Sequence, residues 1–492
     1  MSDAIDAIVI GAGLSGLVAA AYLAKAGKRT VVLEAGSSVG GSCETVPLGK
    51  GFEAPLALHS FHALDPRVMR ELGVARHGLQ YAVRDMPMVG LRSDGRHVVI
   101  ARERRATMRQ LALHARADAE NWPRYRRELF AFGWTMRARW WERATTAKQA
   151  PESLDRLSRQ GAGAFLDSWF ESDALKATLA FDASAMSPLA PGSALLLAWH
   201  ASQEMCGVQD AVASVRGGPG ALARAFEAAA ETAGARIGTG DRVTEIVTEN
   251  GKALGVRVAC GRPVMAPLVF STLSRRATLA CLARGERLGL EEWDDLQSAK
   301  PEIASANLVF GLSALPAFGG IAVPATGRFI LAENLETYES AHAAARAGRL
   351  PDEPTLEFVI PTVSDPQLAP MGQHVLSVRV QPVPALPEGG WLGAKEDFAA
   401  RIVTLLERAM PGFARAVLAM EMLTPDQSVK RHGDRCSHDG LLERLLADWP
   451  ARIETAIGGL FLCGRDAEPV PAVSGRAARI AVRLALGAEQ RP

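Results

Sequence analysis

The sequence predicts an α/β fold built around a strand, a tight turn and a helix near the N-terminus. Two observations predict this unit. Residues 7–10 form a short apolar run, AIVI, which indicates a buried strand. Glycines then follow at positions 11, 13 and 16, and an alanine-rich stretch from Leu17 to about Lys25 is typical of a helix. A strand, a glycine-rich turn and a helix in this order begin a Rossmann-like nucleotide-binding unit.

Each glycine of the turn has its own steric reason. Gly11 allows the tight turn, Gly13 lets the backbone approach a pyrophosphate, and Gly16 lets the helix lie close to the strand. The bare helix N-terminus offers N–H groups and partial positive charge to phosphates. We therefore take the whole turn as a candidate cofactor-binding segment: Gly11, Ala12, Gly13, Leu14, Ser15 and Gly16.

A second strand, predicted from Arg29 to Leu33, ends in Glu34. An acid at this point holds the ribose hydroxyls of a dinucleotide and disfavours a 2′-phosphate. A glycine-rich turn in an ordinary α/β unit is the alternative, but it does not explain the acid. Glu34 and the adjoining Ala35 join the candidate binding residues.

Length and composition restrict the class of protein. A chain of 492 residues is long enough for at least two domains, and its 48% hydrophobic and 22% charged residues are ordinary for a globular protein. The net charge of +1, without a polybasic block, gives no reason to expect nucleic acid as a partner. The nucleotide unit begins at the N-terminus, and no apolar run approaches a membrane span. We expect a cytoplasmic protein without a metal site, and the oligomeric state stays open.

The middle of the chain alternates between helical and extended patterns. A polar turn at residues 49–51 leads to His59, and residues 88–100 predict a hairpin with its turn at residues 93–95. Residues 118–148 predict a helix that is rich in Trp and Arg. That helix is either a membrane-facing lip around a substrate entrance, which would make the protein peripheral to a membrane, or a packed helix with snorkelling arginines, the interpretation that we favour.

Further βα and hairpin units follow in the second half. A glycine-rich turn at residues 216–220 precedes an alanine-rich helix, and strands across residues 235–272 place Val243 near the adenine. Extended runs at residues 304–312, 356–360 and 374–381 predict a second sheet, and Pro382–Pro387 predicts a short stiff loop. Residues 459–464, GLFLCG, predict a buried strand before Arg465 and Asp466, and a helix after Gly475. This last unit either brings further N–H groups to the cofactor or is a plain C-terminal βα unit.

Four segments together resemble the phytoene-desaturase-like FAD-dependent oxidoreductases: DAIVIGAGLSGLVAAAYLAKAG with LEAGSSVGG, RGGPGALARAFEAAAETAGARI, LEFVIPTVSDPQLAPMGQHVLSVRVQ and GLFLCG. FAD enzymes of the amine oxidase and phytoene desaturase type carry a paired glycine after the ribose acid, which matches Gly40 and Gly41. The resemblance therefore implies FAD rather than a nicotinamide cofactor. It adds these residues to the expected site: Gly40, Gly41, Ser42, Val243, Gly464, Arg465, Asp466 and Val473.

The resemblance also implies a domain organisation. It places a discontinuous FAD-binding domain at residues 1–85, 208–280 and 455–492, with an inserted α+β substrate domain at residues 86–207 and 281–454. A long apolar substrate channel is implied between the two domains. Three departures stand out: Ser42 replaces a usual Arg, residues 468–472 replace a glycine-rich flavin loop, and of a Gly-Gly-x-x-x-His pattern only Gly433 and His438 remain.

The expected activity is that of an FAD-dependent dehydrogenase or desaturase acting on a lipophilic (isoprenoid, acyl or similar) substrate, with oxygen or a quinone as electron acceptor. The alternatives are a flavin-dependent amine oxidase, a redox-neutral isomerase, and an FAD-containing scaffold with little turnover. Imidazole is the side chain that titrates near neutrality without help. His59, His200 and His438, in that order, are therefore the candidates for a proton-handling catalytic group.

Overall fold

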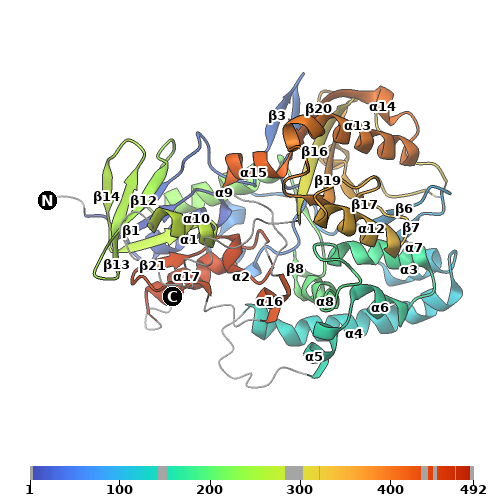
Figure 1. The fold of residues 1–492 in the computed structure, drawn as a ribbon, viewed down its shortest axis with the longest axis horizontal. Coiled ribbons are helices and arrows are strands. Elements are labelled where there is room, and N and C mark those ends of the chain that lie inside the picture. Colours follow the sequence, from blue (N-terminus) through green and yellow to red (C-terminus); the bar gives the residue numbers. More distant parts are fainter. Residues whose placement is uncertain are drawn as a thin grey trace.

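The structure is a computed structural model that describes residues 4–141, 152–282, 303–320, 322–433, 441–446, 452–470 and 472–487. Its two largest sheets lie in different halves of the molecule, with the parallel sheet near the N-terminus and the mixed sheet at the other end (Figure 1). The predicted α/β, Rossmann-like fold is confirmed.

The first sheet has five parallel strands in the order β11-β2-β1-β15-β21. Its strands are β1 (Ala7–Ile10), β2 (Thr30–Leu33), β11 (Arg236–Gly238), β15 (Leu268–Ser271) and β21 (Leu460–Leu462). Strands from distant parts of the chain thus lie side by side. Because all five run parallel, their carboxyl ends meet at one edge, where open α/β sheets bind ligands.

Alternate residues of β1 serve the two faces of this sheet. Ala7 and Val9 pack into a core with helices α1 (Leu14–Lys25), α9 (Gly218–Thr232) and α17 (Arg476–Ala485). Ile8 and Ile10 pack on the other side against the three-stranded unit of β12 (Val243–Glu249), β13 (Lys252–Val258) and β14 (Pro263–Met265). Both faces are covered, so every residue of β1 is buried.

The second sheet has seven strands in the order β20-β16-β19-β18-β17-β6-β7, all antiparallel except the β17–β6 pair. The strands are β6 (Met88–Leu91), β7 (Val98–Ile100), β16 (Ile303–Leu312), β17 (Arg328–Leu331), β18 (Thr355–Val359), β19 (His374–Pro384) and β20 (Val417–Leu423). Helix α13 (Trp391–Ala409) packs against an apolar face of this sheet. The expected loop at Pro382–Pro387 is wrong in its first half, because Pro382 and Pro384 continue β19, and Pro384 pairs with Ile303.

A helical layer packs on the other side of the second sheet. It contains α3 (Arg104–Leu111), α4 (Arg116–Trp141), α5 (Glu152–Arg159), α6 (Ala162–Asp167), α7 (Asp173–Ala180), α8 (Ala194–Ser202) and α16 (Leu441–Leu446). Trp122 and Tyr125 of the Trp-rich helix α4 are buried, and the guanidinium of Arg126 lies 4.0 Å from the centre of the Phe130 ring. These contacts agree with a packed helix. The predicted continuation through residues 142–148 lies outside the described residues.

The remaining helices and strands are β3 (Val46–Gly49), β4 (Phe52–Ala54), α2 (Pro66–Glu71), β5 (Tyr81–Val83), β8 (Glu204–Met205), β9 (Val208–Gln209), β10 (Ser214–Val215), α10 (Arg275–Leu282), α12 (Leu335–Arg346), α14 (Phe413–Ala416) and α15 (Pro425–His432). Across the part of the chain that the structure describes, none of the helices combines the length and the apolar character needed to cross a bilayer.

Candidate functional site

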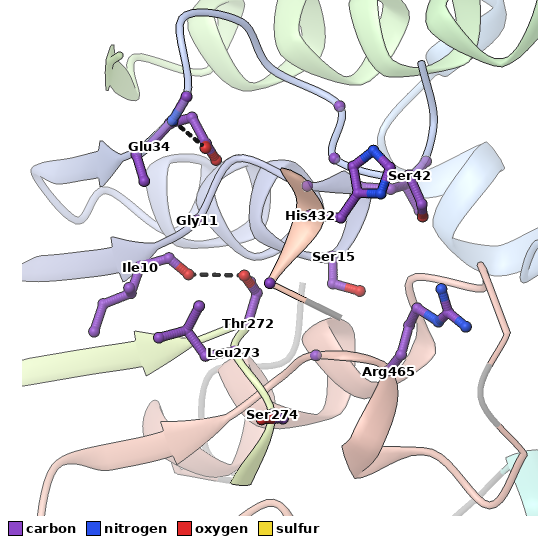
Figure 2. Close-up of a pocket in the computed structure, with 18 of the residues that line it drawn as sticks. Ile10, Gly11, Ser15, Glu34, Ser42, Thr272, Leu273, Ser274, His432 and Arg465 are labelled. Carbon is purple, nitrogen blue, oxygen red and sulfur yellow. Dashed lines mark hydrogen bonds between the residues drawn. The ribbon is translucent and has the colours of Figure 1, made fainter. Parts of the chain in front are cut away.

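A cavity of about 300 Å³ opens at the carboxyl edge of the parallel sheet. Residues that end or follow β1, β2, β15 and β21 form its floor, and α1 begins beside it (Figure 2). The lining contains most of the predicted cofactor residues: Gly11, Gly13, Leu14, Ser15, Glu34, Ala35, Gly40, Gly41, Ser42, Val243, Gly464, Arg465, Asp466 and Val473. The cavity thus collects segments from both ends and the middle of the chain.

The glycine turn shapes the wall at the start of α1. Gly11 has a φ of +92°, which L side chains rarely adopt. A Cβ at Gly16 would lie 1.9 Å from the carbonyl oxygen of Gly11, so only glycine fits this approach of helix to strand. Helix α1 begins at Leu14, three residues before the predicted start at Leu17. A Cβ at Gly13 would meet no atom within 4 Å, so its backbone borders open space for a ligand.

Ala12 and Gly16 do not line the cavity among the described residues. Ala12 is fully buried behind the wall, although its backbone N–H points to Glu34. Both residues therefore contribute packing and backbone groups to the turn. Their predicted role in cofactor binding is untested.

Glu34 is fixed by the backbone around it. Its Oε2 accepts the Ala12 N–H at 2.7 Å, and its Oε1 accepts the Gly36 N–H at 2.7 Å. Each carboxylate oxygen can accept a further hydrogen bond, which matches a pair of ribose hydroxyls. The bonds hold the carboxylate at the end of β2, where the sequence predicts the ribose.

The opposite wall comes from residues that follow β15. Thr272 donates its hydroxyl proton to the Ile10 carbonyl at 2.8 Å and so ties β15 to β1 at the cavity floor. Gly464 packs against this segment, because a Cβ there would lie 2.2 Å from the Thr272 carbonyl oxygen. Leu273 and Ser274 complete this wall (Figure 2).

Residues of α15 cover the cavity, and sequence reasoning missed them. Val429, Lys430, Arg431, His432 and Gly433 all line it. Only Gly433 had been noted, as the remnant of a family pattern. The helix carries a capping box at Thr424 and Gln427. Nothing in its sequence indicates that its last turn reaches the cavity, where His432 contacts Glu44 from 388 residues further along the chain.

The structure describes two of the three predicted proton-handling histidines, and neither lines this cavity. His59 and His200 are absent from the described lining of this cavity, and His438 lies outside the described residues. His59 contacts the polar face of the second sheet, where its Nδ1 lies 3.2 Å from Ser377 Oγ and its Nε2 lies 3.4 Å from Glu357 Oε2. His200 stacks on His62 with ring centres 4.2 Å apart.

A buried charge cluster surrounds these histidines. Glu357 is bound by Arg328 and by Arg379, the latter at 2.5 Å, and Arg328 also bonds Asp182 at 2.5 Å. The register pairs Glu357 with Arg379, so both side chains share one sheet face. This charged face borders the helical layer that carries His200, so a polar region lies beside the aromatic core of α4.

The environment of this cluster sets its ionisation. Burial alone raises the pKa of Glu357, but Arg328 and Arg379 outweigh it and hold the pKa well below its usual range. Asp182 follows the same pattern. Burial raises its pKa, but the charges of Arg328 and then His200 outweigh burial, and the pKa lies below its usual value. Burial, followed by the charge of His200, lowers the pKa of His62 well below its usual value. Two ionised carboxylates therefore face two guanidinium groups.

The altered segment that begins at Glu468 is buried rather than open. Glu468 accepts a hydrogen bond from the Ser474 hydroxyl and lies 3.3 Å from the Ala477 N–H. Burial raises the pKa of Glu468, and the nearby Arg476 only partly opposes this. Val470 and Ala472 pack into the helical core. The segment thus forms part of the packing between α17 and the helical layer.

The described residues hold no group of three or more His, Cys, Asp or Glu side chains that could bind a metal ion. The cavity offers different chemistry: helix N–H groups, a ribose-binding acid, and an open Cα at Gly13. This set fits FAD: Glu34 and Val243 would hold its adenosine, and the start of α1 would hold its pyrophosphate.

Comparison with known proteins agrees with this chemistry. Residues 14–276 match the model of the flavin containing amine oxidoreductase family. Pyridine nucleotide-disulfide oxidoreductase domain-containing protein 2 of Mus musculus is 30% identical over 97% of this chain and 93% of its own length. Phytoene dehydrogenase of Streptomyces griseus is 26% identical over 85% of this chain and 82% of its own length.

Solved structures share the fold. An oxidoreductase from Methanosarcina mazei has a TM-score of 0.66 at 19% identity and covers 97% of this chain and 99% of its own. Putrescine oxidase has a TM-score of 0.63 at 16% identity, with 98% of each chain covered. At these identities the likeness concerns the fold alone.

Fold and cavity together define an FAD-dependent oxidoreductase. The chain belongs to the flavin containing amine oxidoreductase family. The resemblance to phytoene-desaturase-like FAD enzymes that the sequence motifs indicated is confirmed by these relatives.

Proposed function

We propose that the protein is a dehydrogenase or desaturase that removes a hydride from a C–H bond of a lipophilic substrate. The observation that carries the proposal is the FAD-type cavity in a chain whose relatives include phytoene dehydrogenase and a phytoene desaturase, the latter covering 97% of this chain at 25% identity. FAD supplies the hydride acceptor when it is bound. The protein's own residues hold the cofactor, exclude water and align the substrate.

The predicted division of the chain accompanies this proposal. The FAD-binding segments are residues 1–85, 208–280 and 455–492, and the substrate segments are residues 86–207 and 281–454. The aromatic side chains of α4, α6 and α8 belong to the second group, where they pack into a buried core. Oxygen or a quinone remains the proposed acceptor, and peripheral membrane contact at the substrate entrance remains a hypothesis.

The hydrogen bonds around His59 and His200 differ, and this changes their order as proton acceptors. Ser377 donates its hydroxyl proton to the Pro55 carbonyl at 2.9 Å, so its oxygen is left to accept from His59 Nδ1. His59 Nε2 faces the ionised Glu357, which also needs a donor. With both nitrogens arranged to donate, His59 is better suited to positioning.

His200 is less constrained. Its Nε2 lies 3.8 Å from Asp182 Oδ1, beyond hydrogen-bond distance, and its ring stacks on His62. We therefore place His200 before His59 as the group that takes the proton accompanying hydride loss. His200→Ala should lower the rate of flavin reduction about 100-fold at unchanged FAD content. His77→Ala, which lies away from both sites, is the matched control.

Anaerobic reduction with three probes separates the candidate activities. Phytoene should bleach the flavin absorption if the protein is a dehydrogenase. Bleaching by putrescine alone would favour the amine oxidase alternative. Conversion of prolycopene that requires pre-reduced flavin and leaves it reduced would favour an isomerase. The chloroplastic prolycopene isomerase of Arabidopsis thaliana is 28% identical to this chain over 42% of its residues. Flavin that stays oxidised with a broad set of apolar donors would favour the scaffold.

The acceptor is tested on the same bleached sample. Admission of air or a soluble quinone should restore the flavin absorption. The described residues contain one GxGxxG turn, at Gly11, and the turn at residues 216–220 does not repeat it. Reoxidation that occurs rapidly with NADP alone would contradict the acceptor assignment and leave the dehydrogenase assignment intact.

A further inference from the structure

We propose that His432, held in place by Glu44, binds the pyrophosphate of FAD at the N-terminus of α1. The proposal rests on FAD binding and is independent of the hydride-transfer chemistry. It assigns to the last residue of α15 a cofactor contact that the motifs of the nucleotide unit do not contain.

The position of His432 is the first support. It lines the same cavity as Ser42 and as Ser15, which belongs to the first turn of α1 (Figure 2). Helix α15 ends at this residue, and Gly433 follows in the left-handed region with φ of +68°. The side chain is 3% exposed, so it is held inside the protein.

The hydrogen bonding of the ring is the second support. Its Nε2 lies 2.9 Å from Glu44 Oε1, which fixes the ring plane. Its Nδ1 is buried and has no hydrogen-bond partner among the described residues. A buried polar nitrogen without a partner costs free energy that a cofactor oxygen recovers.

The local charge is the third support. Glu44 also accepts from Arg431, whose Nε lies 2.8 Å from Glu44 Oε1. Arg431 also faces Glu421, with 3.9 Å between Arg431 Nη1 and Glu421 Oε1. Three basic residues, Lys430, Arg431 and His432, line the cavity, and a pyrophosphate carries the complementary charge.

The two acceptors also define the state of the ring. A carboxylate and an ionised phosphate oxygen both accept hydrogen bonds, so each needs a proton on the nitrogen that it faces. His432 therefore binds as an imidazolium, with Nε2–H donating to Glu44 and Nδ1–H donating to phosphate. The helix N–H groups of α1 approach the same phosphates from the other side.

This contact accounts for Ser42. Serine stands at position 42, where related FAD enzymes usually have an arginine, so the phosphate site lacks one positive charge. Ser42 and His432 line the same cavity (Figure 2). The positive charge is supplied from α15 instead of from the loop that carries the paired glycines.

The test uses full-length apoprotein with FAD, ADP and adenosine as ligands. His432→Gln, which keeps a polar side chain but no charge, and His432→Ala should each weaken FAD and ADP about tenfold to hundredfold. Adenosine has no phosphate, so its dissociation constant should stay within twofold of wild type. The ³¹P NMR signals of bound FAD should also move in His432→Gln.

A rescue and a control complete the experiment. Ser42→Arg in the His432→Ala background should recover most of the lost FAD affinity, and His77→Gln should leave all three ligands unchanged. Equal FAD affinity in wild type and both His432 variants would overturn the proposal. So would a parallel loss of adenosine affinity in folded protein, since this would indicate a distorted cavity rather than a lost phosphate contact.

Discussion

Arg476 and Asp65 form a buried ion pair between residues 411 positions apart, with 3.2 Å between Arg476 Nε and Asp65 Oδ2. Asp65 also caps α2 by accepting the Arg67 N–H at 2.8 Å, and Arg476 is the first residue of α17. The pair therefore joins the N-terminal part of the chain to the last helix.

Asp65→Asn should lower the free energy of unfolding of the apoprotein by about 3–5 kcal/mol, because it leaves a guanidinium buried without its counter-charge. Thermal unfolding followed by circular dichroism measures this. Glu120→Gln, which breaks the exposed Arg116–Glu120 pair, is the control and should cost less than about 1 kcal/mol. Similar losses in both variants would contradict the role of the buried pair.

The same pair predicts sensitivity to acid. Burial raises the pKa of Asp65, but Arg476 and Arg67 outweigh it, and the pKa lies below its usual value. Because the pKa of Asp65 is lower in the folded protein than in the unfolded chain, the ionised carboxylate stabilises the fold. This contribution is complete above the unfolded pKa of about 3.9, and it is lost as the pH falls through the folded pKa. Wild type should therefore lose stability below about pH 4 more steeply than Asp65→Asn.

Gly13→Ala should separate cofactor binding from folding. The Gly13 φ of −65° suits alanine, and a Cβ there meets no atom within 4 Å, so the apoprotein should keep its stability. The added methyl group occupies the space that the pyrophosphate approaches, and FAD affinity should fall at least tenfold. Gly393→Ala, also without neighbours within 4 Å, is the control. Gly16→Ala should instead destabilise the fold, because its Cβ would meet the Gly11 carbonyl.

Glu34→Gln should weaken FAD binding by about 1.5–3 kcal/mol. The substitution turns one acceptor oxygen into an NH₂ group that faces the Ala12 or Gly36 N–H. It therefore weakens the hydrogen bond to the ribose and removes one hydrogen bond that holds the local turn. Titration of apoprotein with ADP measures the loss. Glu231→Gln on the exposed surface of α9 is the control.

Glu468→Gln should be tolerated and should stabilise the protein at higher pH. Burial raises the pKa of Glu468, so the folded protein binds this proton more tightly than the unfolded chain does. Stability that is present below the unfolded pKa of about 4.3 is lost as the pH rises through the folded value, and the neutral amide avoids this loss. Thermal midpoints at pH 5 and pH 8 should converge in the variant. An unchanged difference between the two pH values would contradict the prediction.

Local patterns explain why the nucleotide unit could be predicted. The strand at Ala7, the glycine turn and Glu34 lie within 30 residues, and each has a backbone reason to be where it is. The seven-stranded sheet was partly visible in its apolar runs. The alternating polar residues Ser377, Arg379 and Gln381 of β19 were also visible in the sequence. Which side chains contact them depends on packing between distant segments of the chain.

The cover of the cavity could not be predicted for the same reason. Helix α15 is short and polar, and His432 belongs to no motif, so its place in the cavity lining follows only from the packing of the whole chain. The order of His59 and His200 likewise depended on the hydroxyl of Ser377, whose own proton is engaged by Pro55. The catalytic roles of both histidines stay predictions.

The strand order of the parallel sheet has a consequence for synthesis on the ribosome. Strand β15 ends at Ser271, whereas its outer neighbour β21 begins at Leu460. At usual elongation rates the nascent chain carries β15 with an unpaired edge for roughly 10 to 40 seconds before β21 is made. Such an edge is a template for misdirected strand pairing. Overproduction of this protein should therefore depend on chaperones that act on the growing chain, and a premature stop before Leu460 should yield aggregates rather than a smaller flavoprotein.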